Sequence, residues 1–397
     1  MKVKLGEVSV LINGDRGKNY PSQADILSDG DIPFVNAGHL DGRSIRLDEM
    51  SYITFEKYNQ LSSGKFRKGD ILYCLRGSLG KKAVVQEIVE GAIASSLVII
   101  RPDSQIIDAN YLILALDSPC IQNQLLKANN GSSQPNLSAA SVRAYEIDLP
   151  NKKVQEEIVN KFDKIQRVID ARKQQLQKLD ELVKARFVEM FGDRNYPHTA
   201  LINLIKDGMG LSYGIVQPGD DGTGEMGVLR PVDMADGKIS MASIKYIDRS
   251  IGDGFRKTEL TGDELLITVR GTTGVTALTD IRFAGMNVTR GIAVIRYDRE
   301  KINPVYLNAY LNTDESQRYI QEHTRGATLQ QINLSDLRVQ EVVVPPTNLQ
   351  NCFAAFVAEV DKSKFRIQKT LSTSRKLWTM DQIDAIMNMD FSTQRSL

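Results

Sequence analysis

The longest regular pattern of hydrophobic positions lies between residues 151 and 192. Side chains with apolar bodies recur there at steps that alternate between four and three residues, which is the spacing of a heptad repeat. Pro150 precedes the run and Gly192 follows it, as expected at the start and the end of a helix. The pattern therefore predicts a long helix that buries one stripe against another helix. The stripe consists of Ile158, Phe162, Ile165, Ile169, Arg172, Leu176, Leu179, Val183, Arg186 and Met190.

A second stretch of helical spacing, over residues 346–390, supplies a partner for the first helix. Its stripe is less regular, because Lys364 and Ser374 interrupt the apolar positions. We expect the two helices to pack as an antiparallel coiled coil, with a polar tail after them at 391–397. The apolar positions of the second stripe are Phe353, Val357, Val360, Ile367, Leu371 and Trp378.

The chain repeats itself at an interval of 195 residues, which separates Pro150 from Pro345 and Gln155 from Gln350. Arg76-Gly77 and Arg270-Gly271 differ by 194, one insertion away. Solenoid repeats are far shorter, so a period of this length indicates a duplicated domain. The predicted division is a first domain at 1–150, a first helix at 151–192, a second domain at 193–345 and a second helix at 346–390.

Between the helices, short apolar runs alternate with turns rich in glycine, aspartate and asparagine. Residues 83–88 and 96–100 have the pattern of strands, and residues 110–126 have helical spacing. Together these patterns predict an α+β fold class, with two mainly β domains arranged as an internal repeat. A chain of 397 residues is long enough for each domain to bury its own core.

Composition narrows the function classes only slightly. With 50 basic and 49 acidic residues the net charge is +1, which argues mildly against autonomous DNA binding but does not exclude a basic groove. No apolar run reaches transmembrane length and the first residues lack a signal-peptide segment, so a cytoplasmic location is expected. The three cysteines are far apart and the three histidines share no spacing, which predicts free thiols and no metal site.

In its tandem order of domain, helix, domain and helix, the chain resembles the specificity subunit of type I restriction-modification systems over essentially its whole length. No single motif is diagnostic, and the resemblance rests on the combination at a constant offset. The local marks are Lys4-Leu5-Gly6-Glu7, the segment from Gly69-Asp70 to Arg76-Gly77, residues 131–136 with their copy at 326–333, and the boundaries at Pro150 and Pro345.

The resemblance implies a division of labour. In that family each globular block is a target recognition domain for one half of a split DNA sequence. The two helices set the spacing and dock two methyltransferase subunits, and restriction subunits complete the nuclease. It implies that this chain has no catalytic residue and no cofactor, and that S-adenosylmethionine, ATP and Mg²⁺ belong to the partner subunits.

The candidate DNA-binding residues lie in equivalent loops of the two blocks and are of types that contact phosphates or base edges. In the apolar stripe of the first helix, Arg172 and Arg186 are register-setting polar positions, partner contacts, or residues whose stems simply pack in the stripe. The candidates of the first block are Lys18, Asn19, Tyr20, Arg76, Ser78, Lys81, Lys82, Ser132, Ser133 and Gln134. Those of the second block are Tyr213, Arg270, Thr272, Thr273, Arg290, Arg325, Thr328 and Gln330.

Two motifs have ordinary explanations. Residues 222–227 match GxGxxG, but a short strand rather than a helix is expected after them, which argues against dinucleotide binding. Residues 303–306, Asn-Pro-Val-Tyr, resemble a methyltransferase motif that lacks one proline, and they suit a helix start. Two other functions stay open: a structural adaptor that does not touch DNA, and a methyltransferase or nuclease acting alone.

Overall fold

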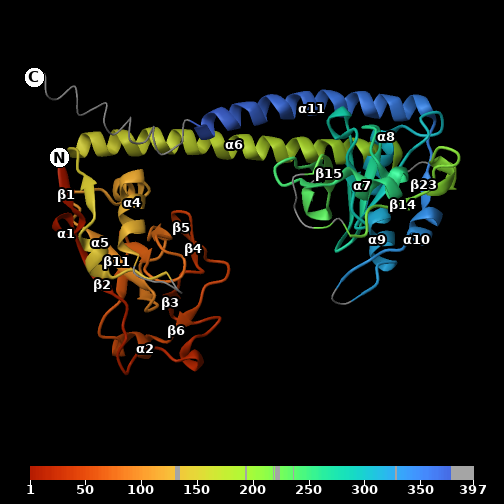
Figure 1. Ribbon diagram of the computed structural model, residues 1–397. Coiled ribbons are helices and arrows are strands. Elements are labelled where there is room, and N and C mark those ends of the chain that lie inside the picture. Colours follow the sequence, from red (N-terminus) through yellow and green to blue (C-terminus); the bar gives the residue numbers. More distant parts are fainter. Residues whose placement is uncertain are drawn as a thin grey trace, which may run out of the picture. The chain divides into compact units, whose positions relative to one another are not determined.

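The computed structural model describes residues 1–129, 135–192, 195–217, 219, 224–235, 237–326 and 329–376. The chain forms two compact units, one made of Met1–Arg172 with the chain from Lys369, and one made of Lys173–Gln368. Each unit contains an α+β block and parts of the two long helices, α6 (Lys152–Phe191) and α11 (Thr347–Lys376) (Figure 1).

The first block is built on two four-stranded sheets. One is antiparallel, in the order β2-β11-β8-β9, and the other has the order β6-β3-β10-β7, in which β3 and β10 run parallel. Two further pairs are β1-β12 and β4-β5. The strands are β1 (Lys2–Lys4), β2 (Ser9–Asn13), β3 (Ile32–Val35), β4 (Leu40–Asp41), β5 (Ser44–Ile45), β6 (Tyr52–Ile53), β7 (Lys65–Arg67), β8 (Ile71–Cys74), β9 (Lys82–Val84), β10 (Glu90–Ile93), β11 (Leu97–Pro102) and β12 (Glu146–Asp148). The helices are α1 (Leu5–Val8), α2 (Phe55–Gln60), α3 (Ala109–Ala115), α4 (Pro119–Ala128) and α5 (Ala139–Arg143).

The second block repeats this topology. Its antiparallel sheet has the order β14-β22-β19-β20, its mixed sheet is β18-β15-β21 with β15 and β21 parallel, and its pairs are β13-β23 and β16-β17. The strands are β13 (His198–Ala200), β14 (Ser212–Tyr213), β15 (Met226–Leu229), β16 (Met234–Ala235), β17 (Lys238–Ile239), β18 (Lys245–Ile247), β19 (Leu265–Arg270), β20 (Thr272–Leu278), β21 (Asn287–Val288), β22 (Ile292–Ile295) and β23 (Glu341–Val343). The helices are α7 (Arg249–Gly252), α8 (Pro304–Leu311), α9 (Asp314–Glu322) and α10 (Leu334–Val339). The predicted α+β repeat is confirmed.

Individual hydrogen bonds also recur at the interval read from the sequence. The buried hydroxyl of Tyr111 donates to the carbonyl of Asp148 at 2.7 Å, and that of Tyr306 donates to the carbonyl of Val343 at 2.8 Å. Both the donors and the acceptors are 195 residues apart. The duplication therefore extends to the side chains that join α3 to β12 in the first block and α8 to β23 in the second.

Each long helix is fastened to its block by a buried glutamine. The Nε2 of Gln155 donates to the carbonyl of Pro150 at 2.9 Å, and that of Gln350 donates to the carbonyl of Pro345 at 2.7 Å. Each glutamine also accepts a backbone N–H from the residue that caps α3 or α8, at 2.8 Å in both blocks. The start of each helix is consequently held in a fixed relation to the block before it.

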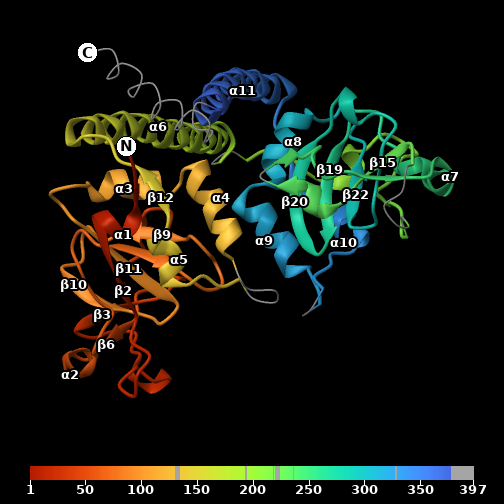
Figure 2. The same cartoon turned by 60° about the vertical axis from the view of Figure 1, so that its left-hand side comes forward.

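The helical stretch predicted at 110–126 is two helices, not one. Ser118 caps the second helix with its hydroxyl, which accepts from the backbone of Ile121, and Pro119 occupies the first turn. Because proline lacks an N–H and its ring restricts the preceding residue, α3 ends before Ser118 and α4 starts after it. Figure 2 shows α3 and α4 below the N-terminal part of α6.

The stripe predicted for α6 is confirmed, since its ten positions are all buried or half-buried. At the N-terminal end, Ile158 belongs to the core of the first block, with Val154, Val159 and Phe162 packed against it. At the C-terminal end, Phe187, Met190 and Phe191 belong to the core of the second block, which also takes in Phe353 of α11. One helix thus contributes to the cores of both blocks.

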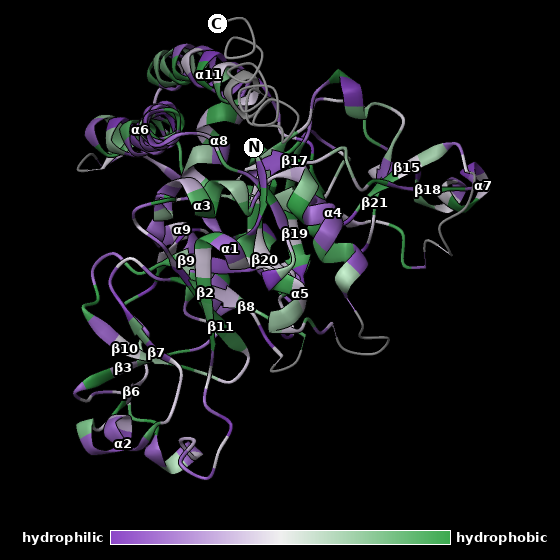
Figure 3. Ribbon diagram, turned by 90° about the vertical axis from the view of Figure 1, so that its left-hand side faces the viewer, coloured by the Kyte–Doolittle hydropathy of each residue, from purple (hydrophilic) through white to green (hydrophobic). Residues whose placement is uncertain are grey.

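Within the second unit, α6 and α11 lie side by side (Figures 1 and 3), and the sequence colours of Figure 1 show that they run antiparallel. The Nζ of Lys364 lies 2.6 Å from Asp180, and the guanidinium of Arg186 lies over the ring of Phe356, 5.8 Å from its centroid. The residue numbers of the two helices run in opposite directions through these contacts. The predicted antiparallel pair is confirmed there, whereas Trp378 and the tail predicted at 391–397 lie outside the described residues.

Candidate nucleic-acid interface

In the first block, the loop after β8 is joined to the loop before α5 by main-chain hydrogen bonds. The N–H of Gly77 donates to the carbonyl of Pro135 at 3.2 Å, and the N–H of Leu137 donates to that of Leu75 at 2.8 Å. These bonds set Arg76 directly opposite Asn136. Gly77 has a φ of +78°, a backbone conformation that favours glycine, and it lets the chain turn immediately after the arginine.

The second block contains the same joint at corresponding positions. The N–H of Gly271 donates to the carbonyl of Gln330 at 2.8 Å, and the N–H of Ile332 donates to that of Val269 at 3.0 Å. Arg270 therefore lies opposite Gln331. On its other side Gln331 pairs with Arg325, with which it exchanges two main-chain hydrogen bonds of 2.8 Å.

The early loop of the first block lies beside this joint. The hydroxyl of Tyr20 accepts from the N–H of Ser95 at 3.3 Å, and the guanidinium of Arg16 donates to the carbonyl of the same serine at 3.3 Å. The carbonyl of Ser96 accepts from Leu75, next to Arg76, at 2.9 Å. The exposed side of residues 16–20, 76–78 and 135–136 is termed the first loop surface.

Equivalent contacts assemble the second block. The N–H of Arg290 donates to the carbonyl of Ile215 at 2.9 Å, and the carbonyl of Gly291 accepts from Val269, next to Arg270, at 2.8 Å. The exposed side of residues 213–216, 270–272, 289–291, 325 and 330–331 is termed the second loop surface. The two surfaces have a common main-chain frame but carry different side chains.

Most of the described candidates lie on or next to these surfaces. Lys18, Arg76, Ser78, Tyr213, Thr272, Arg290, Arg325 and Gln330 are exposed. Asn19, Tyr20, Lys81, Arg270 and Thr273 are half-buried. Ser132, Ser133, Gln134 and Thr328 lie outside the described residues.

Several half-buried candidates already have structural partners. The amide of Asn19 donates to the carbonyl of Gln60 at 2.9 Å, and the ammonium of Lys81 donates to that of Ala37 at 2.9 Å. The hydroxyl of Thr273 lies 3.1 Å from that of Thr324. These contacts fix the shape of the loops and engage the polar groups of the three side chains.

Lys82 does not belong to the first loop surface. Its side chain is only 5% exposed and forms an ion pair with Asp117, which also binds Arg43 at 3.2 Å. An ammonium that is buried and already neutralised is not available to a phosphate group. The sequence could not indicate this, because the partner carboxylate lies 35 residues further along the chain. We therefore leave Lys82 out of the proposed DNA-contacting residues.

A buried carboxylate fixes the early loop of the first block. Asp15 accepts from the N–H of Gly17 and from the N–H of Ser62, both at 2.7 Å. The hydrogen bond from Gly17 holds the pKa of Asp15 below its usual value, although burial opposes this, and the bonds from Ser62 add to the effect. An ionised Asp15 thus stabilises the turn that precedes Lys18.

Each strand that leads into the arginine-glycine loop begins at a buried acid paired with an arginine. Asp70 accepts from Nε and Nη2 of Arg101 at 2.9 and 2.8 Å, and Glu264 lies 3.4 Å from Arg296. Burial opposes ionisation of Glu264, but hydrogen bonds from Thr261 and Thr279 and the charge of Arg296 outweigh it and lower its pKa. These pairs hold the base of the strand at the end opposite the loop.

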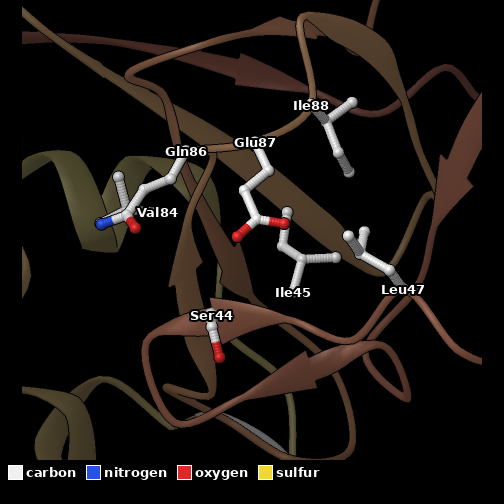
Figure 4. A pocket seen from close by; sticks show the side chains of 7 residues that line it. All are labelled: Ser44, Ile45, Leu47, Val84, Gln86, Glu87 and Ile88. Carbon is white, nitrogen blue, oxygen red and sulfur yellow. The ribbon is translucent and has the colours of Figure 1, made fainter.

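The hollows found in the first block are not on the loop surface. One of about 40 Å³ lies between the β4–β5 hairpin and the segment after β9, lined in part by Ile45, Leu47 and Glu87 (Figure 4). A larger one, of about 600 Å³, has the paired Arg43 and Asp117 in its wall.

The two motifs with ordinary explanations fold accordingly. Gly222 and Thr223 of the GxGxxG match lie outside the described residues, and strand β15, not a helix, follows. Asn303 caps α8 through its side chain and Pro304 begins the helix. Among the described residues no group of side chains suited to hold a metal ion occurs, and no helix is long and apolar enough to cross a membrane.

Comparison with known proteins assigns the family. Residues 1–181 and 230–374 match the model of the type I restriction modification DNA specificity domain. The chain belongs to this family. A solved structure, from a study of complex assembly and conformational transition of the type I R-M system, is similar to this specificity-family chain with a TM-score of 0.64. The match covers 98% of this chain and 97% of that one at 17% identity, and shows a common fold.

Two curated members of the specificity family match this chain over about half of its length. The EcoBI specificity subunit of Escherichia coli is 23% identical over 257 residues, which is 57% of this chain and 54% of the relative. The HindI specificity subunit of Haemophilus influenzae is 23% identical over 202 residues, 50% of this chain and 43% of the relative. The chain spans about half the length of the curated relatives it matches.

Sequence reasoning about this specificity-family chain missed three residues of the loop surfaces. Arg16 adjoins the predicted Lys18, and Asn136 and Gln331 lie opposite Arg76 and Arg270. A signal for the last two was present, because they are 195 residues apart and both carry an amide. Only the main-chain pairing shows that these two amides lie opposite the arginines.

Proposed function

We propose that this chain is the DNA-recognition subunit of a type I restriction-modification complex, and that each block reads one half of a split target. The observation that carries the proposal is the duplicated joint, in which one main-chain frame displays Arg76 in the first block and Arg270 with Arg325 in the second. Membership of the specificity family supports it. A shared frame with different exposed side chains suits two half-sites of different sequence.

The exposed residue types fit recognition of base edges in the major groove. Arginine donates two hydrogen bonds to guanine, and asparagine or glutamine pairs in the same way with adenine. Exposed cations such as Lys18 and Arg290 are suited to phosphates, which position a protein on the duplex without reading sequence. The near-neutral net charge fits a subunit whose partners share the work of binding phosphates.

We further propose that the chain is not itself catalytic. Adenine methylation and ATP-driven cleavage are assigned to partner subunits, which bring S-adenosylmethionine, ATP and Mg²⁺. We also propose that residues 1–150 and 193–345 are the two recognition domains. The spacer helices are then residues 151–192 and 346–390.

The long helices are proposed to dock two methyltransferase subunits, with restriction subunits joining the assembly. In the second unit, Leu182 of α6 and Phe365 of α11 are 47% and 68% exposed, so each helix has apolar surface outside its buried stripe that a partner could cover. Arg172 and Arg186 stay the proposed polar contacts. Arg186 also packs inside the helix pair, since it binds Glu189 at 2.7 Å and lies over Phe356.

The test is methylation by the complex of this chain with its co-encoded methyltransferase subunits, read by single-molecule methylome sequencing. We expect the wild-type complex to methylate a split sequence. Arg76→Ala should relax one half of it and Arg270→Ala the other, while both variants still assemble.

The rival functions predict different outcomes. A structural adaptor that does not touch DNA would leave sequence selectivity unchanged in the double variant. A methyltransferase or nuclease acting alone would be active without any partner subunit, and assays of the purified chain with S-adenosylmethionine and DNA detect this. A complex that assembles but shows no split target contradicts the proposal.

A further inference from the structure

We infer that Asn136 and Gln331 read bases, each as a partner of the arginine that the main-chain joint sets opposite it. The inference rests on the proposed function and specifies which side chains carry out the recognition. Arg76 with Asn136, and Arg270 with Gln331, then form one arginine–amide pair on each loop surface.

The hydrogen-bond pattern determines how close the paired side chains are. In both joints the bonds are made by the residues before and after the pair, Leu75 and Gly77 in the first and Val269 and Gly271 in the second. A pair flanked in this way is a non-hydrogen-bonded antiparallel pair. Its Cα atoms are about 4.5 Å apart and its two side chains lie on the same face. Arginine and amide therefore project together.

The alternation of buried and exposed residues shows which face this is. Leu75 and Leu137, which neighbour the first pair, are buried in the core of the first block, and Val269 and Ile332 are buried in that of the second. Successive residues of an extended chain point to opposite faces. The paired residues accordingly point away from those cores, and Arg76 and Asn136 are exposed while Arg270 and Gln331 are half-buried.

The polar groups of these side chains are available to a ligand. In the described part of the chain, the side chains of Arg76, Asn136, Arg270 and Gln331 take part in no hydrogen bond or ion pair. Their neighbours Lys81 and Thr273, by contrast, have protein partners. The joint thus positions the side chains through main-chain atoms and leaves their donors and acceptors unused.

The spacing of the pair matches the spacing of the ligand. Directly opposite side chains have Cβ atoms about 5 Å apart, and successive base pairs are stacked about 3.4 Å apart. An arginine–amide pair can therefore reach one base pair or two adjacent ones. In the second block Arg325 lies on the other side of Gln331, 3.7 Å from Asp336, so the amide there is flanked by two arginines.

The experiment compares single variants in the complex with the co-encoded methyltransferase subunits, acting on a DNA library in which both half-sites are randomised. We expect Asn136→Ala to lower the preference for the correct base over the other bases at one base pair of one half-site, by about 10- to 100-fold. Gln331→Ala should do the same at one base pair of the other half-site. The half-site that is not affected serves as an internal control for folding and assembly.

Matched controls are Gln105→Ala and Glu300→Ala, at exposed positions that correspond to each other in the two blocks. Gln105 lies between β11 and α3, and Glu300 lies between β22 and α8. Both substitutions should leave both half-sites unchanged. Gln331→Arg should convert, rather than only relax, the preference at its base pair, towards guanine.

The outcomes separate the inference from the function on which it rests. A wild-type complex that methylates no split sequence overturns both. A wild-type split sequence that Asn136→Ala and Gln331→Ala leave intact, while Arg76→Ala and Arg270→Ala alter it, overturns this inference alone. Uniform weakening across all sequences would assign the two amides to phosphate contact and likewise overturn it.

Discussion

Lys82 and Asp117 of the first block correspond to Thr276 and Asn312 of the second. The first two form a buried ion pair, whereas the hydroxyl of Thr276 accepts from the amide of Asn312 at 2.6 Å. Both interactions tie an edge strand of the antiparallel sheet, β9 or β20, to the residues between the two helices that follow, α3 and α4 or α8 and α9. The same connection is therefore made by charged groups in the first block and by neutral groups in the second. The energetic consequences of losing it differ.

Removal of Asp117 should cost more than removal of Asn312, its counterpart in the second block. Asp117→Ala leaves the ammonium of Lys82, which is 5% exposed, without its counter-ion, and we expect a loss of about 2 kcal/mol because Asp117 itself is partly exposed. Asn312→Ala removes two neutral hydrogen bonds, to Thr276 and to the carbonyl of Asn308, and should cost about 1 kcal/mol. Urea denaturation followed by circular dichroism measures both, and equal costs would contradict the argument.

Glu264 should make the stability of the second block depend on pH. Its pKa is lowered in the folded state from an ordinary value of 4.5, so the carboxylate stabilises the fold above that pH. The contribution is lost as the pH falls through the lowered pKa. Glu264→Gln should destabilise the protein at pH 7, and the difference from the wild type should narrow as the pH falls below the ordinary pKa of 4.5. Parallel curves of unfolding midpoint against pH would show that Glu264 is not responsible.

The candidate site was predictable as a set of loops but not residue by residue. The repeat located the equivalent loops, and exposed arginines such as Arg76 and Arg325 were found in them. The burial of Lys82 depends on Asp117, and the role of Asn136 depends on a main-chain joint with Leu75 and Gly77. Such long-range contacts leave no local pattern in the sequence.

At the scale of elements, the long helices were the most predictable part of the fold. A stripe sustained over several heptads is a strong signal, and α6 extends from Lys152 to Phe191 within the predicted range 151–192. The short strands and the break between α3 and α4 were less predictable. Apolar runs of a few residues suit either a strand or a buried helix, and only tertiary packing decides between them.

The irregular position of the second stripe has a physical explanation and suggests a test. Lys364 is 17% exposed and reaches Asp180 of α6, which is 64% exposed, so the pair is partly screened by water. Lys364→Leu would fill the stripe, and we expect it to stabilise the helix pair by about 1 kcal/mol. Lys362→Leu, at an exposed position two residues earlier, should leave the thermal unfolding temperature almost unchanged.

At the scale of the whole molecule, the proposed function makes the length of the helices a property of the DNA target. Insertion of one heptad into α6 and one into α11 adds about 10 Å to each helix, which is about three base pairs of duplex. We expect the gap in the methylated sequence to grow by that amount while both half-sites stay the same. Methylome sequencing measures the gap directly.

The matched control inserts five residues in place of seven. Five residues rotate the rest of the apolar stripe by about 140°, away from its partner helix, so this variant should lose assembly or activity rather than shift the gap. Altered half-sites in the heptad variant would contradict the assignment of the helices as spacers.

The joint between the loops of each surface is made by main-chain atoms, and this has a consequence for how the protein evolves. The side chains at positions 76, 136, 270 and 331 take no part in the bonds that hold the loops together. Mutations at these four positions should therefore carry little folding penalty. Under the proposed function, a library randomised there would consist largely of folded proteins with altered target sequences. Selection for a new target sequence can then proceed without first restoring stability.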